Sequence, residues 1–190
     1  MSERQQSWVE SAQDPNGDFP IENLPFGMFE RSGESGPRVG TAIGDQVLDL
    51  EAAVDAGLLS DLPDAVRTAM GGDSLNEFAS FGRPIVGQAR AAIRALLLRG
   101  DDRLQGHAER GRIVIPASDV RMGLPFKVGD YTDFYASENH ATNVGRMFRP
   151  DGDPLLPNWK HLPVGYHGRA SSIVESGRAI RRPSPKHSTV

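Results

Sequence analysis

Cysteine is absent from the 190-residue sequence, and its strongly apolar runs are short. The lack of thiols excludes a disulfide scaffold, thiolate zinc sites and cysteine nucleophiles. The longest strongly apolar run is the segment 96–98, far shorter than a membrane span. The N-terminal segment, MSERQQSWVESAQD, is polar and acidic and lacks the apolar region of a secretory signal. We therefore expect a cytoplasmic protein without a membrane partner.

Positive charge is slightly outnumbered by negative charge. Lysine and arginine number 21 against 25 aspartates and glutamates, which gives a formal net charge of −4. Nucleic-acid binding needs a dense positive face. The one local basic cluster, formed by Arg178, Arg181 and Arg182, is interpreted as a solvated surface. We therefore predict no nucleic-acid partner.

The composition that remains is that of an ordinary globular protein, with 38% hydrophobic and 24% charged residues. The length suits one good-sized domain, or one small domain and part of another.

The first part of the chain predicts a small β-structure, a barrel or sheet rather than a helical bundle. Residues 39–43 and 46–50 are short apolar-rich runs separated by Gly44 and Asp45. This dipeptide is suited to the tight turn of a hairpin. Residues 28–31 predict a third strand.

Helical patterns follow this β-structure. Leu50, Val54 and Leu58 repeat at helical spacing, and Gly57 is expected to end that helix. The tetrad 74–77 (SLNE) has the signature of a capping box, in which serine and glutamate satisfy each other's free backbone donors.

The clearest predicted helix begins near Pro84 and ends at Gly100. Proline suits a first helical turn, residues 85–96 carry apolar side chains at helical spacing, and glycine is typical of a helix end.

A second unit is expected after this helix. Residues 101–112 are charged and contain two glycines, which predicts a linker, and residues 113–116 (IVIP) predict a strand that begins the second unit. The predicted domains are residues 1–118 and 119–190. The chain then stops without an element that closes the second domain, so we expect a fragment, or a domain completed by other chain.

Residues 129–169 hold most of the side chains that carry chemistry. All three tyrosines and three of the five histidines lie there, among carboxylates, guanidinium groups and glycines. A segment that only filled a core would be dominated by leucine, isoleucine and valine. This composition indicates a site for a small polar ligand, together with a metal.

Asp133 and His140 are the candidate reactive groups. Asp133 can hold a hard divalent cation, because Ca²⁺ and Mg²⁺ prefer oxygen ligands. His140 can take a proton from water, because imidazole titrates near neutral pH. Each residue also has a structural interpretation: a lone aspartate more often caps a helix or turn, and a lone histidine is more often a hydrogen-bonded structural residue. A hard-cation site usually needs several carboxylates.

Tyr135, Arg149 and Tyr166 are the candidate binding residues, because they supply donors for carbonyl and carboxylate oxygens. A helix is expected from 137 onward and should end at Arg149, because the proline that follows disfavours helical geometry there. For Arg149 and His140 to face one ligand, the chain must turn just before Arg149.

Two further metal patterns have simpler interpretations. Residues 151–153 (DGD) resemble part of a calcium loop, but the remaining EF-hand ligand positions are not filled, so we predict a turn. His140, His161 and His167 are a candidate zinc set, but they lack any recognised metalloprotease spacing.

Several longer segments match a known family. They are residues 19–27 (FPIENLPFG), 44–50 (GDQVLDL), 129–135 (GDYTDFY), 140–145 (HATNVG), 157–159 (PNW) and 162–172 (LPVGYHGRASS). Together they closely resemble the fumarylacetoacetase family, hydrolases of tyrosine degradation, and the similarity runs from about residue 19 to residue 183.

This resemblance implies a mixed α+β, mainly β fold, with a small SH3-like N-terminal barrel followed by the start of a β-rich catalytic domain. It implies a homodimer, a bound Ca²⁺ or Mg²⁺, and a β-diketone acid substrate, fumarylacetoacetate, which is hydrolysed at a carbon–carbon bond to fumarate and acetoacetate. By position, Asp133 matches a metal ligand and His140 the general base. Tyr135, Arg149 and Tyr166 match residues that hold the substrate.

Two alternatives stay open. One is a related acylpyruvate or other β-diketone hydrolase. The other is a catalytically incomplete fragment with a structural or dimerisation role, because the remaining metal carboxylates of the family and the glutamate that orients its histidine have no counterpart here. We therefore expect an enzyme as the parent protein and an inactive segment.

Overall fold

A computed structural model of the chain describes residues 6–34, 36–162 and 164–182. The chain divides into two compact units. The first comprises the described residues up to Lys127 together with those from Glu175 on, and the second is Val128–Val174. Each unit is described by itself.

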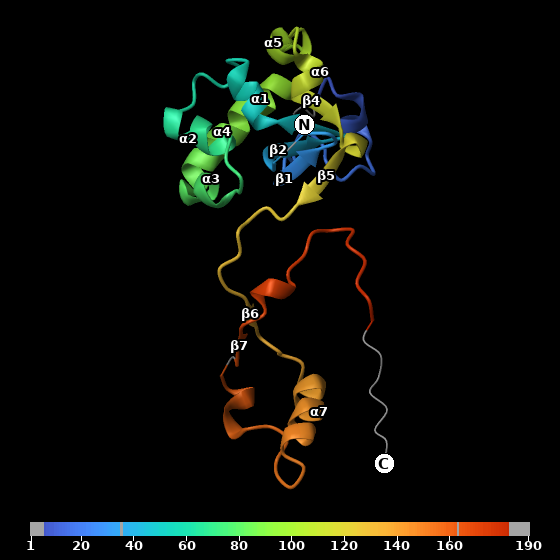
Figure 1. Ribbon diagram of the computed structural model, residues 1–190, viewed down its shortest axis with the longest axis vertical. Helices are drawn as coiled ribbons and strands as arrows, with labels where there is room; N and C mark the ends of the chain where they lie inside the picture. The colour runs from blue at the N-terminus through green and yellow to red at the C-terminus, as the bar shows by residue number, and fades with distance from the viewer. Residues whose placement is uncertain (1–5, 35, 163, 183–190) are drawn as a thin grey trace, which may run out of the picture. The chain divides into compact units, whose positions relative to one another are not determined.

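A curled five-stranded antiparallel sheet forms the centre of the first unit, with strand order β4-β3-β2-β1-β5 (Figure 1). The strands are β1 (Phe26–Arg31), β2 (Arg38–Ile43), β3 (Gln46–Asp49), β4 (Val114–Pro116) and β5 (Val120–Gly123). This half-barrel, together with the helices beside it, confirms the predicted mixed α+β class with a small N-terminal β-barrel.

The predicted hairpin is confirmed. β2 and β3 pair from Gly40↔Asp49 to Ile43↔Gln46, so that Gly44 and Asp45 form a two-residue turn. Gly44 has φ +56°, whereas Asp45, the second residue of the turn, does not have a positive φ. This is the pattern of a type II′ turn. A side chain at Gly44 would also overlap the N-terminal segment packed beside it.

Helices cover one side of the sheet and bury a common core (Figure 1). Leu48 of β3, Leu50 of α1 and Ile93 of α4 are all 0% exposed. The α-helices of the first unit are α1 (Leu50–Asp55), α2 (Asp64–Met70), α3 (Asn76–Ser80), α4 (Gly82–Leu97), α5 (Asp102–Gln105) and α6 (Arg110–Ile113). Two 3₁₀ helices accompany them: η1 (Glu10–Gln13) precedes β1, and η2 (Ala117–Asp119) lies between β4 and β5.

Helices α1 and α4 follow the sequence prediction. α1 ends at Asp55, two residues before Gly57, which has φ +74°. α4 places Pro84 in its first turn and ends at Leu97, followed by Gly100 with φ +94°. These glycines adopt the left-handed conformation that other residues avoid.

The predicted linker at residues 101–112 is wrong, because that segment contains α5 and α6. The Asp101 side chain accepts a hydrogen bond from the Arg103 backbone N–H at 3.0 Å and so caps α5. Leu104 and Ile113 are both 0% exposed. Helices α5 and α6 are too short to show a periodic pattern in the sequence, and the burial of these two apolar side chains stabilises them.

The predicted capping box at residues 74–77 is also wrong. The N-cap of α3 is Leu75, and it makes no side-chain capping hydrogen bond. The Leu75 backbone N–H instead donates to the Pro125 carbonyl at 2.8 Å, and the Asn76 side chain bonds to the backbone of Lys127. The start of α3 is therefore bonded to a distant segment of the chain rather than closed by its own serine and glutamate.

At the junction between β3 and α1, the fully buried carboxylate of Asp49 forms ion pairs with two arginines. Asp49 is 0% exposed and accepts hydrogen bonds from Arg31 Nη2 and from Arg38 Nε, the latter at 2.6 Å. Its Oδ1 caps α1 by accepting from the Ala52 backbone N–H at 2.9 Å. The hydrogen bonds to Asp49 raise the pKa of the Arg38 guanidinium above its usual value.

The strand predicted at 113–116 exists as β4, but it pairs with β3 and so completes the first sheet rather than beginning a second unit. The division into domains 1–118 and 119–190 stays a prediction. Among the helices of the described residues, none is both long and apolar enough to cross a membrane.

The second unit contains a short two-stranded sheet and one longer helix. Its elements are β6 (Thr132–Asp133), α7 (Glu138–Phe148), η3 (Pro157–Lys160), β7 (Tyr166–His167) and η4 (Ala170–Ser172). Ala141 is 3% exposed, whereas Phe134, Met147 and Phe148 are 58%, 78% and 76% exposed. This unit therefore buries few side chains and leaves large apolar ones in contact with water.

Candidate active site

The second unit contains a cavity of about 570 Å³. All five sequence-predicted site residues line it, and they come from three different segments of the unit. The lining residues are Asp133, Tyr135, His140, Ala141, Val144, Gly145, Phe148, Arg149, Pro154, Leu155, Leu156, Asn158, Trp159, Val164, Tyr166 and Arg169. His161 and His167, which belonged to the alternative zinc set, are not among them.

Helix α7 supplies one wall. The Ser137 hydroxyl accepts a hydrogen bond from the His140 backbone N–H at 3.4 Å and so caps the helix start, as the sequence indicated. From there His140, Val144 and Phe148 recur at intervals of four residues and share the helix face that lines the cavity. The His140 ring meets the Tyr135 ring edge-on, with centroids 6.3 Å apart and planes at 89°.

Arg149 reaches the same cavity because the helix ends just before it. α7 stops at Phe148, and Arg149 leaves helical geometry with φ −134° and ψ 67°. Its Nε donates to the Asp153 carbonyl at 3.2 Å and its Nη2 to the Pro154 carbonyl at 2.6 Å. The predicted turn therefore occurs, and it fixes the guanidinium by backbone carbonyls while leaving its positive charge for a ligand.

Gly145 permits this part of the chain to fold back on α7. A Cβ at this position would overlap the carbonyl group of Pro154. The absence of a side chain therefore allows the segment after the helix to lie against the helix itself, which brings the residues on either side of the turn to one cavity.

The opposite wall comes from β6 and β7, in which Asp133 pairs with Tyr166 across the strands. A Cβ at Gly165 would lie 2.9 Å from Cγ2 of Thr132, so glycine permits this close approach. Gly168 has φ +142° and donates its N–H to the Tyr131 carbonyl at 3.2 Å. Gly165 thus permits a close approach of the strands, and Gly168 permits a tight turn after β7.

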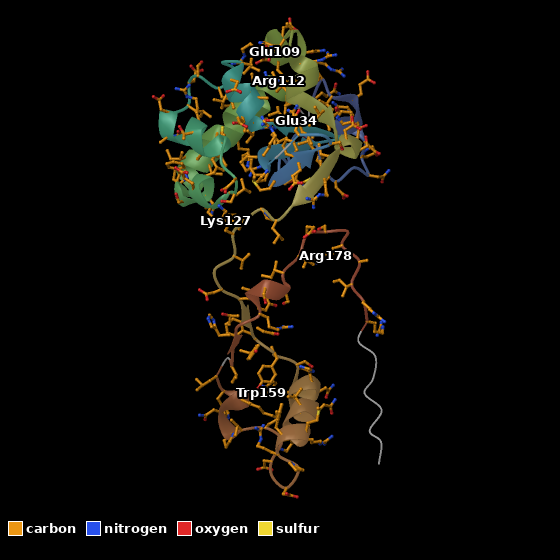
Figure 2. All side chains as sticks on the ribbon, viewed as in Figure 1. Glu34, Glu109, Arg112, Lys127, Trp159 and Arg178 are labelled. Carbon is orange, nitrogen blue, oxygen red and sulfur yellow. The ribbon has the colours of Figure 1, made fainter. Side chains whose placement is uncertain are left out.

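Among the lining residues whose side chains carry polar atoms, three were not among the site residues predicted from the sequence. Asn158 and Trp159 lie on η3, and Figure 2 shows Trp159 on the side of η3 that faces α7. Arg169 lies two residues after the end of β7, and its Nη2 forms an ion pair with Oδ2 of Asp133. Asn158, Trp159 and Arg169 all belong to motifs shared with the family, and this membership was the one available signal for them.

The carboxylate of Asp133 does not by itself fit a hard cation. Calcium takes six to eight oxygen ligands, and magnesium requires near-ideal octahedral coordination. Asp133 is the single acidic residue that lines the cavity, and its Oδ2 is occupied by Arg169. In residues 6–34, 36–162 and 164–182, no group of three or more histidines or carboxylates converges. A Ca²⁺ or Mg²⁺ ion at Asp133 therefore needs further ligands from elsewhere.

Chemically, the cavity combines an open apolar floor with polar groups at its walls. Phe148 and Leu156 are 76% and 62% exposed, and Tyr166 is 55% exposed. One imidazole, two phenols and two guanidinium groups face the same space. This set suits a small acid whose carbon chain lies on apolar side chains while its oxygens meet hydrogen-bond donors.

Comparison with known proteins gives the family. Residues 22–125 match the family model described as fumarylacetoacetase N-terminal. A fumarylacetoacetase of Bos taurus is 47% identical over 181 residues, which cover 93% of this chain and 42% of the relative. That of Caenorhabditis elegans is 48% identical over 171 residues, 88% of this chain and 40% of the relative.

The Homo sapiens fumarylacetoacetase is 46% identical over 181 residues, again 93% of this chain and 42% of the relative. The chain thus spans about two fifths of the length of the curated relatives that it matches. The family model covers more than half of the chain, and the identity extends through the cavity-bearing unit. The chain therefore belongs to the fumarylacetoacetase family, of which it carries the N-terminal region.

Proposed function

We propose that this chain is part of a hydrolase that splits a carbon–carbon bond of fumarylacetoacetate to give fumarate and acetoacetate, in the degradation of tyrosine and phenylalanine. The observation that carries the proposal is that Tyr135, His140, Arg149 and Tyr166 line one cavity together with Asp133. The names of the relatives support the same reaction.

His140 is proposed as the general base. It takes a proton from a water molecule, whose oxygen attacks the carbonyl carbon next to the bond that breaks. The electron pair of that bond stays with the acetoacetate fragment, which leaves as an enolate. The imidazolium of His140 then returns a proton to the carbon of that enolate. In the part of the chain that the structure describes, no carboxylate pairs with the His140 ring. An orienting carboxylate from elsewhere in the whole protein is therefore part of the proposal.

Substrate binding is assigned to three residues. The guanidinium of Arg149, held by the carbonyls of Asp153 and Pro154, faces a substrate carboxylate. The phenols of Tyr135 and Tyr166 donate to the oxygens of the diketone. The apolar side chains beside them, Val144 among them, support the carbon chain.

The whole protein is proposed to carry a divalent cation, Ca²⁺ or Mg²⁺, with Asp133 as one of its ligands. The described residues do not form a ligand set on their own, so the roles given to His140, Tyr135, Arg149 and Tyr166 do not depend on this ion. We also propose that the whole protein is a cytoplasmic homodimer, which light scattering coupled to gel filtration would test.

The 190-residue chain alone is proposed to be inactive. The large exposed side chains of the second unit, such as Phe134 and Met147, support this proposal, because apolar surface of this kind is usually covered by other protein. In the whole protein, further chain would cover these side chains and complete the site.

The test is a hydrolysis assay that follows loss of the diketone absorbance with fumarylacetoacetate and, in parallel, with an acylpyruvate. We expect the whole protein to prefer fumarylacetoacetate and the 190-residue chain to turn over neither. A preference for acylpyruvate would favour the related β-diketone hydrolase. An active 190-residue chain would overturn the proposal that it is incomplete.

A further inference from the structure

We propose that Arg169 is a positioning residue of this site, which acts through Asp133 by holding its carboxylate at the cavity wall. The inference rests on the proposed function, because that function includes Asp133 among the residues of the site.

The contacts of the Arg169 side chain point to this role. Its Nη2 donates to Oδ2 of Asp133, and the same guanidinium lies 5.7 Å from the centroid of the Tyr131 ring. Asp133 and Arg169 both line the cavity. The guanidinium is thus held between an aromatic face and a carboxylate, two groups to which arginine binds well.

The backbone fixes the reach of this side chain. β7 pairs with β6 through Asp133↔Tyr166, and the Gly168 N–H donates to the Tyr131 carbonyl. Immediately afterwards, the Arg169 carbonyl accepts hydrogen bonds from both the backbone N–H and the hydroxyl of Ser172, at 2.9 and 2.8 Å. Arg169 is therefore anchored on both sides, while its side chain turns back to the residues opposite.

The two guanidinium groups of the cavity differ in their partners, and this difference separates their roles. Arg149 donates to backbone carbonyls and keeps its full charge for an anionic ligand. Arg169 donates to a carboxylate, so its charge is already matched. We therefore assign ligand binding to Arg149 and orientation of Asp133 to Arg169.

A role in stability alone is a weak explanation of the pair. The side chains of Arg169 and Asp133 are 52% and 35% exposed, and ion pairs this accessible to water stabilise a fold little. The consequence of losing Arg169 is expected to be a change in where the Asp133 carboxylate points.

Steady-state kinetics of the whole protein with fumarylacetoacetate tests the role. Arg169→Gln should lower kcat by roughly 10- to 100-fold with little change in KM, because a misplaced group costs rate rather than binding. Arg169→Lys should recover part of the rate. Arg149→Gln, the matched control from the same cavity, should raise KM. A raised KM with unchanged kcat for Arg169→Gln would mean that Arg169 binds substrate directly and would overturn the proposal.

The dependence on Asp133 is tested by a double-variant comparison. If Arg169 acts only through Asp133, Arg169→Gln should change the residual rate of Asp133→Asn little. Loss of the same factor in both backgrounds would show that Arg169 acts independently of Asp133, against the proposal.

Nitrogen-15 NMR of the arginine side chains in the 190-residue chain gives a readout that does not depend on turnover. Asp133→Ala should speed rotation of the Arg169 guanidinium, while that of Arg149 stays unchanged. Equal rotation of Arg169 with and without Asp133 would refute the ion pair and with it the proposal. If the whole protein fails to turn over fumarylacetoacetate but the NMR result holds, the proposed function fails while the positioning of Asp133 by Arg169 stands.

Discussion

Asp49 offers the sharpest test of how the first unit is held together. This carboxylate is 0% exposed, and it pairs with Arg31 and Arg38, whose side chains are 13% and 20% exposed. Removing the charge of Asp49 leaves the guanidinium groups of Arg31 and Arg38 largely buried without this carboxylate. Breaking a buried ion pair from one side typically costs about 3–5 kcal/mol. Because both arginines retain some contact with water, we expect a value near the lower end, about 3 kcal/mol, for Asp49→Asn.

Asp49→Ala should cost more than Asp49→Asn. Asparagine keeps an oxygen that can accept from the Ala52 N–H and so still caps α1, whereas alanine loses the cap, which contributes about 1 kcal/mol. The assay is urea unfolding of the 190-residue chain, followed by circular dichroism. A loss of about 3 kcal/mol lowers the urea midpoint by roughly 1–3 M.

The control for this experiment is Asp18→Asn, an exposed aspartate in the same unit. It should change the free energy of unfolding by less than about 0.5 kcal/mol. If Asp49→Asn were as mild as Asp18→Asn, the arginines would not depend on Asp49, and our account of the junction between β3 and α1 would be wrong.

Two further predictions concern the cavity and acid stability. Gly145→Ala should lower the rate at which the whole protein hydrolyses fumarylacetoacetate by about tenfold or more, because the added Cβ would overlap the Pro154 carbonyl. Gly152→Ala is the control and should leave the rate unchanged, because the added Cβ there meets open space. Equal activity of the two variants would contradict the close contact between Gly145 and Pro154. The hydrogen bond from Arg103 lowers the pKa of the Asp101 carboxyl, so its contribution to stability is present above the unfolded-state pKa, about 3.9, and is lost as pH falls through the lower folded-state value. Asp101→Asn should therefore flatten the acid limb of stability against pH, measured by urea unfolding between about pH 5 and 2, and an unchanged acid limb would count against this pair.

Local patterns predicted the hairpin and the long helix because their signals lie within a few residues. Gly44 and Asp45 specify a two-residue turn, Pro84 lies in the first turn of α4, and Gly100 follows the end of that helix. The tetrad at 74–77 failed because Leu75 donates to Pro125, 50 residues away in the chain, a partner that no local pattern reveals. The short helices α5 and α6 were missed for a similar reason, since burial rather than periodicity holds them.

The candidate site shows the same division. The turn before Arg149 follows from the proline after it, and helical spacing places His140, Val144 and Phe148 on one face of α7. The pairing of Asp133 with Arg169 spans 36 residues and depends on the register of β6 and β7. Sequence reasoning alone could place both residues in shared motifs but could not bring their side chains together.

The measurement that tests the central claim most directly is hydrolysis of fumarylacetoacetate by the whole protein and its His140→Ala variant. His161→Ala is the matched control, because His161 lies in the same unit but does not line the cavity. We predict that His140→Ala lowers kcat by about 100-fold or more while His161→Ala leaves it near the wild-type value. Equal loss in both variants, or full activity of His140→Ala, would contradict the assignment of His140 as the general base.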